Sequence, residues 1–370
     1  MTAARPTLHF IEWLRIGLVS LVVAHHGAQA YGPTGGAWPV FEAERSQWLD
    51  PFFAVNAGFF MGLFFLISGY FVPASLARKG ARRFAADRLV RLGPPLVIMG
   101  FLVFPFIGYA GTDGGQGFLA YYAEVYIGQW RVTYGPLWFV FHLLVYGLAF
   151  ASLAVAFPRL AAEGLAPPTG HRGLIGLAVV IAVAGGLVRL EFPQDRWVNF
   201  LGVMPMEPAH LPQYLALFVA GTVAGRHRWF ETIPAAVGRV WLGVGLAAAV
   251  FWYALRYFDE FAGFRLLDAA TVRDLFPVWE ATLAVGLAVG LVVHFRERWN
   301  RPHPWLGPLA GAAYGVFILH VFVVVGLNLV FLGVPLPPFA KFLAVTGLAL
   351  VLCFAAVILL RRLPGVARVL

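Results

Sequence analysis

The sequence contains few charged residues and a single cysteine. Only 12 % of its 370 residues are charged and 60 % are hydrophobic, whereas a soluble domain has about 25 % charged residues. This composition excludes a water-soluble globule, and it excludes a disordered chain, which needs low hydrophobicity and high charge. Cys353 lies in an apolar run, so a disulfide scaffold and a cysteine-based metal site are also excluded. The composition predicts a polytopic membrane protein.

Several catalytic motifs are missing as well. The sequence has no Walker loop, which argues against ATP hydrolysis. It has no His-x-x-x-His or Gly-x-Ser-x-Gly pattern, so nothing supports a zinc protease or an elbow hydrolase. Carboxylates within apolar runs are scarce apart from Glu12 and Glu280, which disfavours a proton-coupled pump. We expect no metal site and no permanently bound cofactor.

We interpret ten apolar runs as membrane spans, each of which needs about 20 residues. The longest loops, 111–134 and 191–210, are too short to fold alone. The predicted fold class is therefore all-α: one domain, residues 1–370, formed by a polytopic transmembrane helical bundle. The ten predicted spans are 8–31, 52–73, 90–110, 135–157, 173–190, 211–226, 236–256, 277–295, 308–331 and 341–360.

The distribution of basic residues predicts the orientation of this bundle. The net charge is +9, and the positive residues lie in short loops between apolar runs. With the N-terminus inside, the inner segments hold 18 basic residues and the outer segments hold seven. This asymmetry predicts that both termini are cytoplasmic. We expect a multi-pass protein of a bacterial inner membrane, surrounded by lipid and without a nucleic-acid partner.

The first predicted helix contains an unusual set of polar residues. Glu12 and Arg15 are three residues apart and can pair on one face. Arg15 and His26 are eleven residues apart, which leaves an angular offset of about 20° and a separation of roughly 16 Å along the helix. The three residues thus form one polar stripe, whereas His25 points elsewhere. In the alternative interpretation, Glu12 and Arg15 reach the interface and His26 is hydrogen-bonded inside the bundle.

Four further features have both a functional and a structural interpretation. Arg88 and Arg91 share a helix face and can bind a phosphate, or they anchor the helix at the inner interface. The Ser68-Gly69 pair favours close helix packing. Trp138 and His142 lie one turn apart; His142 lines a cavity, or Trp138 belongs to an interfacial belt and His142 is hydrogen-bonded in the bundle. Tyr314 and His320 lie six residues apart and do not share a helix face.

In order, these motifs resemble the acyltransferase-3 family of integral membrane acyltransferases. That family begins with an acidic residue, two residues, an arginine, ten residues and a histidine, as from Glu12 to His26. The departures are glutamate in place of the frequent aspartate and a second histidine at His25, and we expect no fused hydrolase-like domain. The chain looks like the stand-alone branch, which includes enzymes that succinylate periplasmic glucans. The later matching segments are Phe64–Gly69, Arg88–Arg91, Pro136–Phe139, Tyr214–Gly221 and Tyr314–His320.

The resemblance implies O-acyl transfer from cytoplasmic acyl-CoA to a hydroxyl of a glycan or lipid-linked sugar. We expect His26 to act as general base or transient acyl acceptor, Arg15 to orient it or stabilise the oxyanion, and Glu12 to hold Arg15. The residues predicted to bind the donor are Arg88, Arg91 and Ser68. The residues predicted to contact substrate are Trp138, His142, Tyr314 and His320.

Two other functions stay open from the sequence. A transporter or flippase would use the same polar residues to line a tunnel, without chemistry. A non-catalytic partner in glycan assembly would tolerate the loss of His26. The sequence also leaves open the acyl group, the acceptor, the membrane face of the transfer, a homo-oligomeric state and any role of His25.

Overall fold

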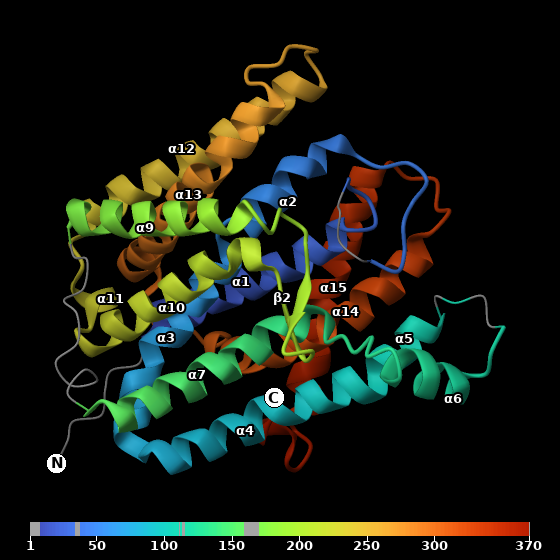
Figure 1. Cartoon of the computed structure of the whole chain (residues 1–370), viewed down its shortest axis with the longest axis horizontal. Helices are drawn as coiled ribbons and strands as arrows, with labels where there is room; N and C mark the ends of the chain where they lie inside the picture. Colours follow the sequence, from blue (N-terminus) through green and yellow to red (C-terminus); the bar gives the residue numbers. More distant parts are fainter. Residues whose placement is uncertain (1–7, 34–37, 111, 113–114, 159–169, 370) are drawn as a thin grey trace.

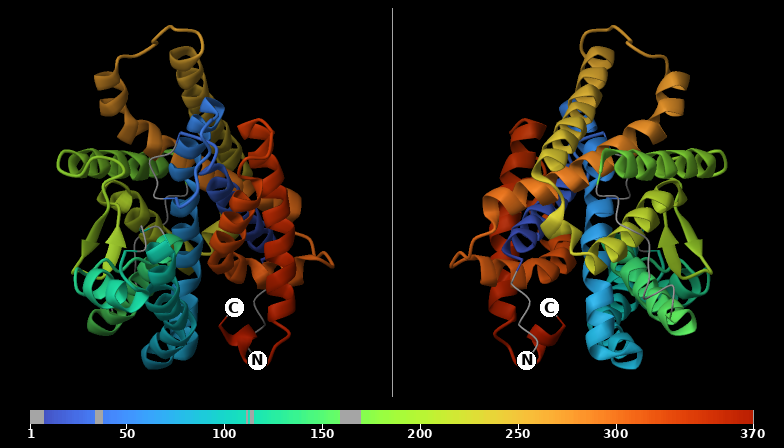
Figure 2. Two further views of the ribbon diagram at one scale, coloured as in Figure 1. Left: turned by 90° about the vertical axis from the view of Figure 1, so that its right-hand side faces the viewer. Right: turned by 90° about the vertical axis from the view of Figure 1, so that its left-hand side faces the viewer.

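The computed structural model describes residues 8–33, 38–110, 112, 115–158 and 170–369, and Figures 1 and 2 show that helices dominate its architecture. The helices in the first half are α1 (His9–Ala28), η1 (Gln47–Leu49), α2 (Asp50–Ala57), α3 (Phe60–Lys79), α4 (Ala81–Ile98), η2 (Met99–Val103), α5 (Phe104–Ala110), α6 (Phe118–Ala120), η3 (Tyr121–Ile127), η4 (Gly135–Leu137) and α7 (Trp138–Ala156). The second half comprises α9 (His171–Arg189), β1 (Val198–Phe200), β2 (Met204–Met206), η5 (Pro208–His210), α10 (Leu211–Arg226), α11 (Trp229–Thr232), α12 (Ala235–Glu260), α13 (Ala269–Trp299), α14 (Leu306–Phe331), α15 (Pro338–Leu360) and η6 (Val366–Arg368).

An all-α, polytopic membrane architecture is confirmed. Eight helical segments of the described residues are long and apolar enough to cross a membrane. The helices α1 and α10 are not among them: α1 contains Glu12 and Arg15, and α10 has only 16 residues. Ten spans and two cytoplasmic termini therefore stay predictions. The eight segments are 47–79, 81–109, 135–156, 171–189, 235–260, 269–299, 306–331 and 338–360.

The structure corrects two boundaries drawn from hydropathy. The span predicted at 90–110 begins at Ala81, because α4 continues through a charged stretch that an apolar run does not reveal. The predicted loop 191–210 contains an antiparallel hairpin, in which Val198 pairs with Met206 and Phe200 with Met204. The hairpin covers the start of α7, since the carbonyl oxygen of Pro205 contacts the imidazole of His142.

Glycines allow α3 and α10 to touch along their backbones. A Cβ atom on Gly69 would lie 2.3 Å from the carbonyl oxygen of Phe218, and one on Gly221 would lie 2.2 Å from that of Leu66. Real Cβ atoms do not approach so closely, so both positions require glycine. The packing interpretation of the Ser-Gly segment is confirmed, and its partner is the Phe-x-x-Gly segment of α10.

The two ends of the bundle differ in composition. At one end, which we call the arginine end, Trp13 lies 5.5 Å from Trp299 between ring centroids, and the guanidinium of Arg91 lies over the ring of Tyr314. The opposite end has the β1–β2 hairpin and the tip of the α12–α13 pair. Figure 1 shows this pair projecting beyond the other helices at the top of the view.

Candidate active site

Two histidines from distant parts of the chain meet in the bundle. His26 is near the end of α1 and His320 lies in the middle of α14. The Nδ1 atom of His26 lies 3.2 Å from Nε2 of His320 and 3.0 Å from the carbonyl oxygen of Val22. The Nδ1 atom of His320 lies 2.7 Å from the carbonyl oxygen of Phe317. His320 is fully buried and His26 is half-buried.

These contacts assign the protons of the neutral pair. A carbonyl oxygen only accepts hydrogen bonds, so Nδ1 of His320 donates to Phe317, and Nε2 of a neutral His320 is then an acceptor. Nδ1 of His26 consequently donates to His320 and Val22. The remaining nitrogen, Nε2 of His26, has a free lone pair and no hydrogen-bond partner among the described residues. A base of this tautomer is ready to accept a proton.

Aromatic and amide side chains enclose the pair on the side away from the arginine end. The ring of Trp38 lies 5.5 Å from that of His26, and its Nε1 donates a hydrogen bond of 3.0 Å to Asn328. Asn328 in turn donates to the hydroxyl of Tyr31. His25 packs against phenylalanines of α2 and α3, including Phe53 at 5.2 Å. The prediction that His25 points away from the polar stripe is confirmed.

Three arginines gather at the arginine end without acidic partners. Arg15 of α1 interacts electrostatically with Arg91 of α4, and Arg91 with Arg88. None of the three has a carboxylate within 4.0 Å among the residues that the structure describes. Tyr314 makes two contacts with Arg91. Its ring centroid lies 5.4 Å from the guanidinium carbon, and its hydroxyl donates a hydrogen bond of 3.4 Å to the Arg91 carbonyl oxygen. This arrangement is suited to an anion.

The predicted pairing of Glu12 with Arg15 is wrong. The carboxylate of Glu12 instead lies 3.4 Å from Nδ1 of His9, one turn earlier in α1. Glu12 lies three residues from both His9 and Arg15, so it can pair with either, and in the structure its carboxylate contacts His9. Glu12 acts on Arg15 only through its charge at longer range.

The stripe predicted on α1 connects the arginines to the histidine pair. Arg15 and His26 are separated by about 16 Å of helix, and Tyr314 and His320 by about 9 Å. Both helices therefore have one polar group at the arginine end and one deeper in the bundle. Contacts at both levels join α1 and α14 into a single candidate site.

The structure does not bring Trp138, His142 and Ser68 into this site. His142 is 1 % exposed, and its nitrogens contact the hydroxyl of Tyr146 at 3.3 Å and the carbonyl oxygen of Pro205 at 3.1 Å. Trp138 stacks on Tyr214 beneath the hairpin. Ser68 makes no side-chain hydrogen bond in the described part of the chain. An aromatic layer that includes Phe65, Phe139 and Phe317 separates His142 from His320.

A second buried polar group was missed by the sequence analysis. We call it the ion cluster: Arg189, Glu207, His210 and Glu280. Nη2 of Arg189 lies 2.7 Å from Oε2 of Glu280, and Nδ1 of His210 contacts the other oxygen of that carboxylate. Nε2 of His210 lies 3.4 Å from Oε1 of Glu207.

The positive and negative charges of this cluster balance one another. Burial lowers the pKa of His210, but Glu280 and Glu207 outweigh that effect and raise this pKa to about 10. Burial raises the pKa of Glu207, but His210, the backbone N–H of Asp195 and the charge of Arg189 together outweigh burial and lower this pKa overall. His210 is therefore a cation at neutral pH. Two cations face two carboxylates, with His210 and Glu280 almost entirely buried.

The fold and the contacts together define a polytopic helical membrane protein in which a histidine pair lies deeper in the bundle than three arginines, none of which has a carboxylate within 4.0 Å among the described residues. The model of the acyltransferase-3 family, described as an acyltransferase domain, matches residues 8–358. The chain belongs to this family and is a membrane acyltransferase. Searches of curated proteins and of solved structures found no significant match.

Proposed function

We propose that the protein transfers an acyl group from cytoplasmic acyl-CoA to a hydroxyl of a glycan or lipid-linked sugar outside the cytoplasm. One observation supports this most directly: the free Nε2 of His26 lies on the same side of α1 as Arg15, which is grouped with two other arginines that lack acidic partners. The base and the anion site are thus joined by one helix.

The arginine group fits the phosphates of the donor. A guanidinium group can bind two phosphate oxygens at once, and no carboxylate of the described residues lies within 4.0 Å of Arg88, Arg91 or Arg15. The positive-inside asymmetry predicts that this end faces the cytoplasm, where acyl-CoA occurs. Between the phosphates and the thioester of acyl-CoA lies the pantetheine arm, which in its extended form is comparable to the roughly 16 Å between Arg15 and His26.

His26 would activate the acceptor. Nε2 takes the proton of the acceptor hydroxyl while the hydroxyl oxygen attacks the thioester carbonyl carbon. The tetrahedral oxyanion then collapses, the C–S bond breaks, and the thiolate leaving group takes the proton back from His26. The lone pair on Nε2 of His320 stabilises the imidazolium through the Nδ1–H of His26. Arg15 would stabilise the oxyanion or bind the donor. In an alternative mechanism, His26 accepts the acyl group transiently before it passes to the acceptor.

Thiol release tests this proposal. The protein, purified in lipid nanodiscs, is given a panel of acyl-CoAs with a glycolipid extract as acceptor, and free CoA is measured. We expect acceptor-dependent release, lowered about 10²–10⁴-fold in His26→Ala with unchanged thermal stability. His25→Ala is the matched control, since His25 is a neighbouring histidine that faces the phenylalanines.

The outcomes separate the remaining functions. A folded His26→Ala variant that keeps most of its rate contradicts the base assignment. Movement of a substrate across the bilayer without thiol release from any donor favours the transporter. Full function of His26→Ala in a glycan assembly complex favours the non-catalytic partner.

A further inference from the structure

Residues 38–46, which we call the strap, fold back onto the end of α1 without forming a helix or a strand. The backbone N–H of Glu42 donates a hydrogen bond of 3.0 Å to the carbonyl oxygen of Ala30. Further along the strap, the N–H of Ser46 donates one of 2.7 Å to the carbonyl oxygen of Tyr31. Most side chains of the strap are exposed. Its backbone is thus held close to the end of α1 at which the proposed base lies.

Trp38 is the residue through which the strap reaches the histidine pair. It is only 8 % exposed, and its ring centroid lies 5.5 Å from that of His26 at an interplanar angle of 37°. Its Nε1 donates a hydrogen bond of 3.0 Å to Asn328 of α14. Asn328 is 1 % exposed, and its amide nitrogen donates to the hydroxyl of Tyr31 at 3.2 Å. Both ends of a buried amide therefore hold one indole ring against the base.

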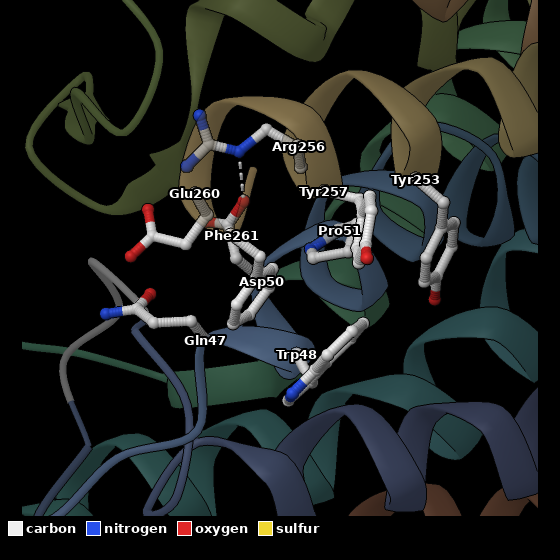
Figure 3. Close-up of a pocket in the computed structure, with 9 residues that line it drawn as sticks. All are labelled: Gln47, Trp48, Asp50, Pro51, Tyr253, Arg256, Tyr257, Glu260 and Phe261. Atoms are coloured by element: carbon white, nitrogen blue, oxygen red, sulfur yellow. Dashed lines mark hydrogen bonds and ion pairs between the residues drawn. The ribbon is translucent and has the colours of Figure 1, made fainter. Parts of the chain in front are cut away.

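Ion pairs fix the strap and the helix that follows it. Nζ of Lys341, near the start of α15, lies 2.5 Å from Oε1 of Glu42, and these two side chains are 5 % and 13 % exposed. Beyond the strap, Nε of Arg256 donates to Asp50 of α2 at 2.6 Å, as Figure 3 shows. A buried ion pair needs both of its partners. The strap is therefore seated between α1 and α15, on the side of the histidine pair away from the arginine end.

A base with a free lone pair accepts a proton from water as well as from a sugar hydroxyl. If Nε2 of His26 takes a proton from water, the water oxygen attacks the thioester carbonyl carbon, the C–S bond breaks, and the thiolate takes the proton back. The products are then a free acid and CoA, and the acceptor receives no acyl group. A transferase consequently has to keep water away from its base, which is one function of a closed active site.

We propose that Trp38 is a positioning residue that shields His26 from water, so that the base takes its proton from an acceptor hydroxyl. The indole adds an apolar wall beside the imidazole, and Asn328 keeps it there. With the arginine end in the cytoplasm, as the positive-inside asymmetry predicts, this wall lies on the side from which an acceptor outside the cytoplasm reaches the base. The proposal rests on the proposed function for the base and the thioester, whereas the contact between the two rings does not.

Hydrolysis of acyl-CoA without acceptor measures the shielding. The full chain in nanodiscs is given the panel of acyl-CoAs, and free CoA and free acid are measured with and without the glycolipid extract. We expect hydrolysis without acceptor to rise about tenfold in Trp38→Ala. The rise should be smaller in Trp38→Phe, which keeps an aromatic ring but loses the hydrogen bond to Asn328. A purely structural role would instead lower transfer and hydrolysis together.

Trp48→Ala is the matched control for both Trp38 variants. Trp48 follows the strap directly, but it is 54 % exposed and stacks on Phe261 at 4.2 Å, as Figure 3 shows. Its loss removes an indole from the same loop without uncovering His26. We therefore expect Trp48→Ala to hydrolyse acyl-CoA at the rate of the wild type.

A second measurement requires no acyl donor. Diethylpyrocarbonate modifies a neutral imidazole: the free nitrogen attacks a carbonyl carbon, an N–C bond forms, and monoethyl carbonate leaves. Mass spectrometry gives the rate of this modification at His26 in a His25→Ala background, which removes the neighbouring histidine. We expect the rate to rise about 3- to 10-fold when Trp38→Ala is added, as for the loss of one aromatic contact, and to stay constant when Trp48→Ala is added.

The two measurements separate this proposal from the proposed function. If the wild type transfers acyl groups but folded Trp38→Ala hydrolyses no more acyl-CoA than Trp48→Ala, only the shield is overturned. If the wild type cleaves no donor, the proposed acyl transfer fails and the modification rate decides alone: a faster rate in Trp38→Ala supports the shield, and an equal rate overturns it. If Trp38→Ala does not fold, the same comparisons are made with Trp38→Phe.

Discussion

The bundle contains two buried histidine centres that differ in how their charges are matched. In the ion cluster, the arginine and the cationic histidine face carboxylates from α13 and the segment before η5. In the candidate active site, the histidines face each other and backbone carbonyls, and the arginines face no carboxylate in the described part of the chain. The charges of the first centre are matched, whereas no carboxylate among the described residues matches the arginines of the second.

We interpret this difference as one between a structural group and the proposed functional group. A buried ion is costly unless a partner is present, so a compensated cluster is stable without any ligand. Arginines that have no carboxylate partner in the described part of the chain would instead be stabilised by a bound phosphate. Both centres contain a histidine and an arginine, so residue type alone does not distinguish them. The predictions below test the distinction.

The largest expected effect is on the ion cluster. Glu280→Gln leaves Arg189 and His210 without their shared carboxylate, so we expect a loss of about 3–5 kcal/mol in the free energy of unfolding. Unfolding in mixed micelles measures this. Glu297→Gln, which removes an exposed partner of Arg296, should cost less than about 1 kcal/mol. Equal losses in the two variants would show that the cluster does not hold the fold.

Substitution of Arg88 or Arg91 should weaken substrate binding and leave the stability of the protein unchanged. Arg88→Gln and Arg91→Gln each remove a charged hydrogen-bond donor, so the KM for acyl-CoA should rise about 10- to 100-fold while the KM for the acceptor stays constant. Steady-state kinetics with each substrate varied in turn give both values. Arg83→Gln, on the exposed side of the same helix, is the control. A parallel rise in both KM values would favour the anchor interpretation.

His320 is expected to act through His26. His320→Leu removes the acceptor for Nδ1–H of His26, so kcat should fall about tenfold with little change in either KM. His320→Gln retains an acceptor oxygen and should recover most of the rate. Rates of both variants at saturating substrate provide the comparison. If glutamine fails to improve on leucine in a folded protein, the hydrogen bond is not the reason for the loss.

The most gradual expected effect is a pH dependence of the free energy of unfolding from His210. The pKa of His210 is about 10 in the folded protein, above its ordinary value of about 6.5. Its stabilisation is therefore fully present below pH 6.5 and is lost as the pH rises to about 10. The slope is at most about 1.4 kcal/mol per pH unit. Unfolding of the wild type and His210→Gln across this range should show their stabilities converging, whereas a constant gap would contradict a cationic His210.

Local spacing predicted part of the site correctly. The eleven-residue interval between Arg15 and His26 holds in any α-helix, so their common face was accessible from the sequence. The Ser-Gly packing followed from residue size. The Glu12–Arg15 pair was not decided by spacing, because His9 competes for the same carboxylate.

Contacts between distant helices could not be predicted in this way. His26 and His320 are 294 positions apart, and no local rule indicates that α1 and α14 meet at those residues. The ion cluster joins α9, the segment before α10, and α13. The hydrogen-bond partner of His142 Nε2 is the carbonyl oxygen of Pro205 in the hairpin, which lies 63 positions away. Polar residues in apolar runs, such as Glu280 and Asn328, were the available signal that polar contacts exist, but they did not identify the partners.

Composition and hydropathy alone determined that this chain is an all-α membrane protein. In lipid no water is available to the backbone N–H and C=O groups, and a long apolar helix forms all of these hydrogen bonds internally. The ordered motifs indicated its family. Only the tertiary structure decided which histidine keeps a free ring nitrogen, which arginines have no carboxylate within 4.0 Å among the described residues, and which arginine is paired with one. These properties depend on partners supplied by other helices, and the charge state of a buried group is set by those partners.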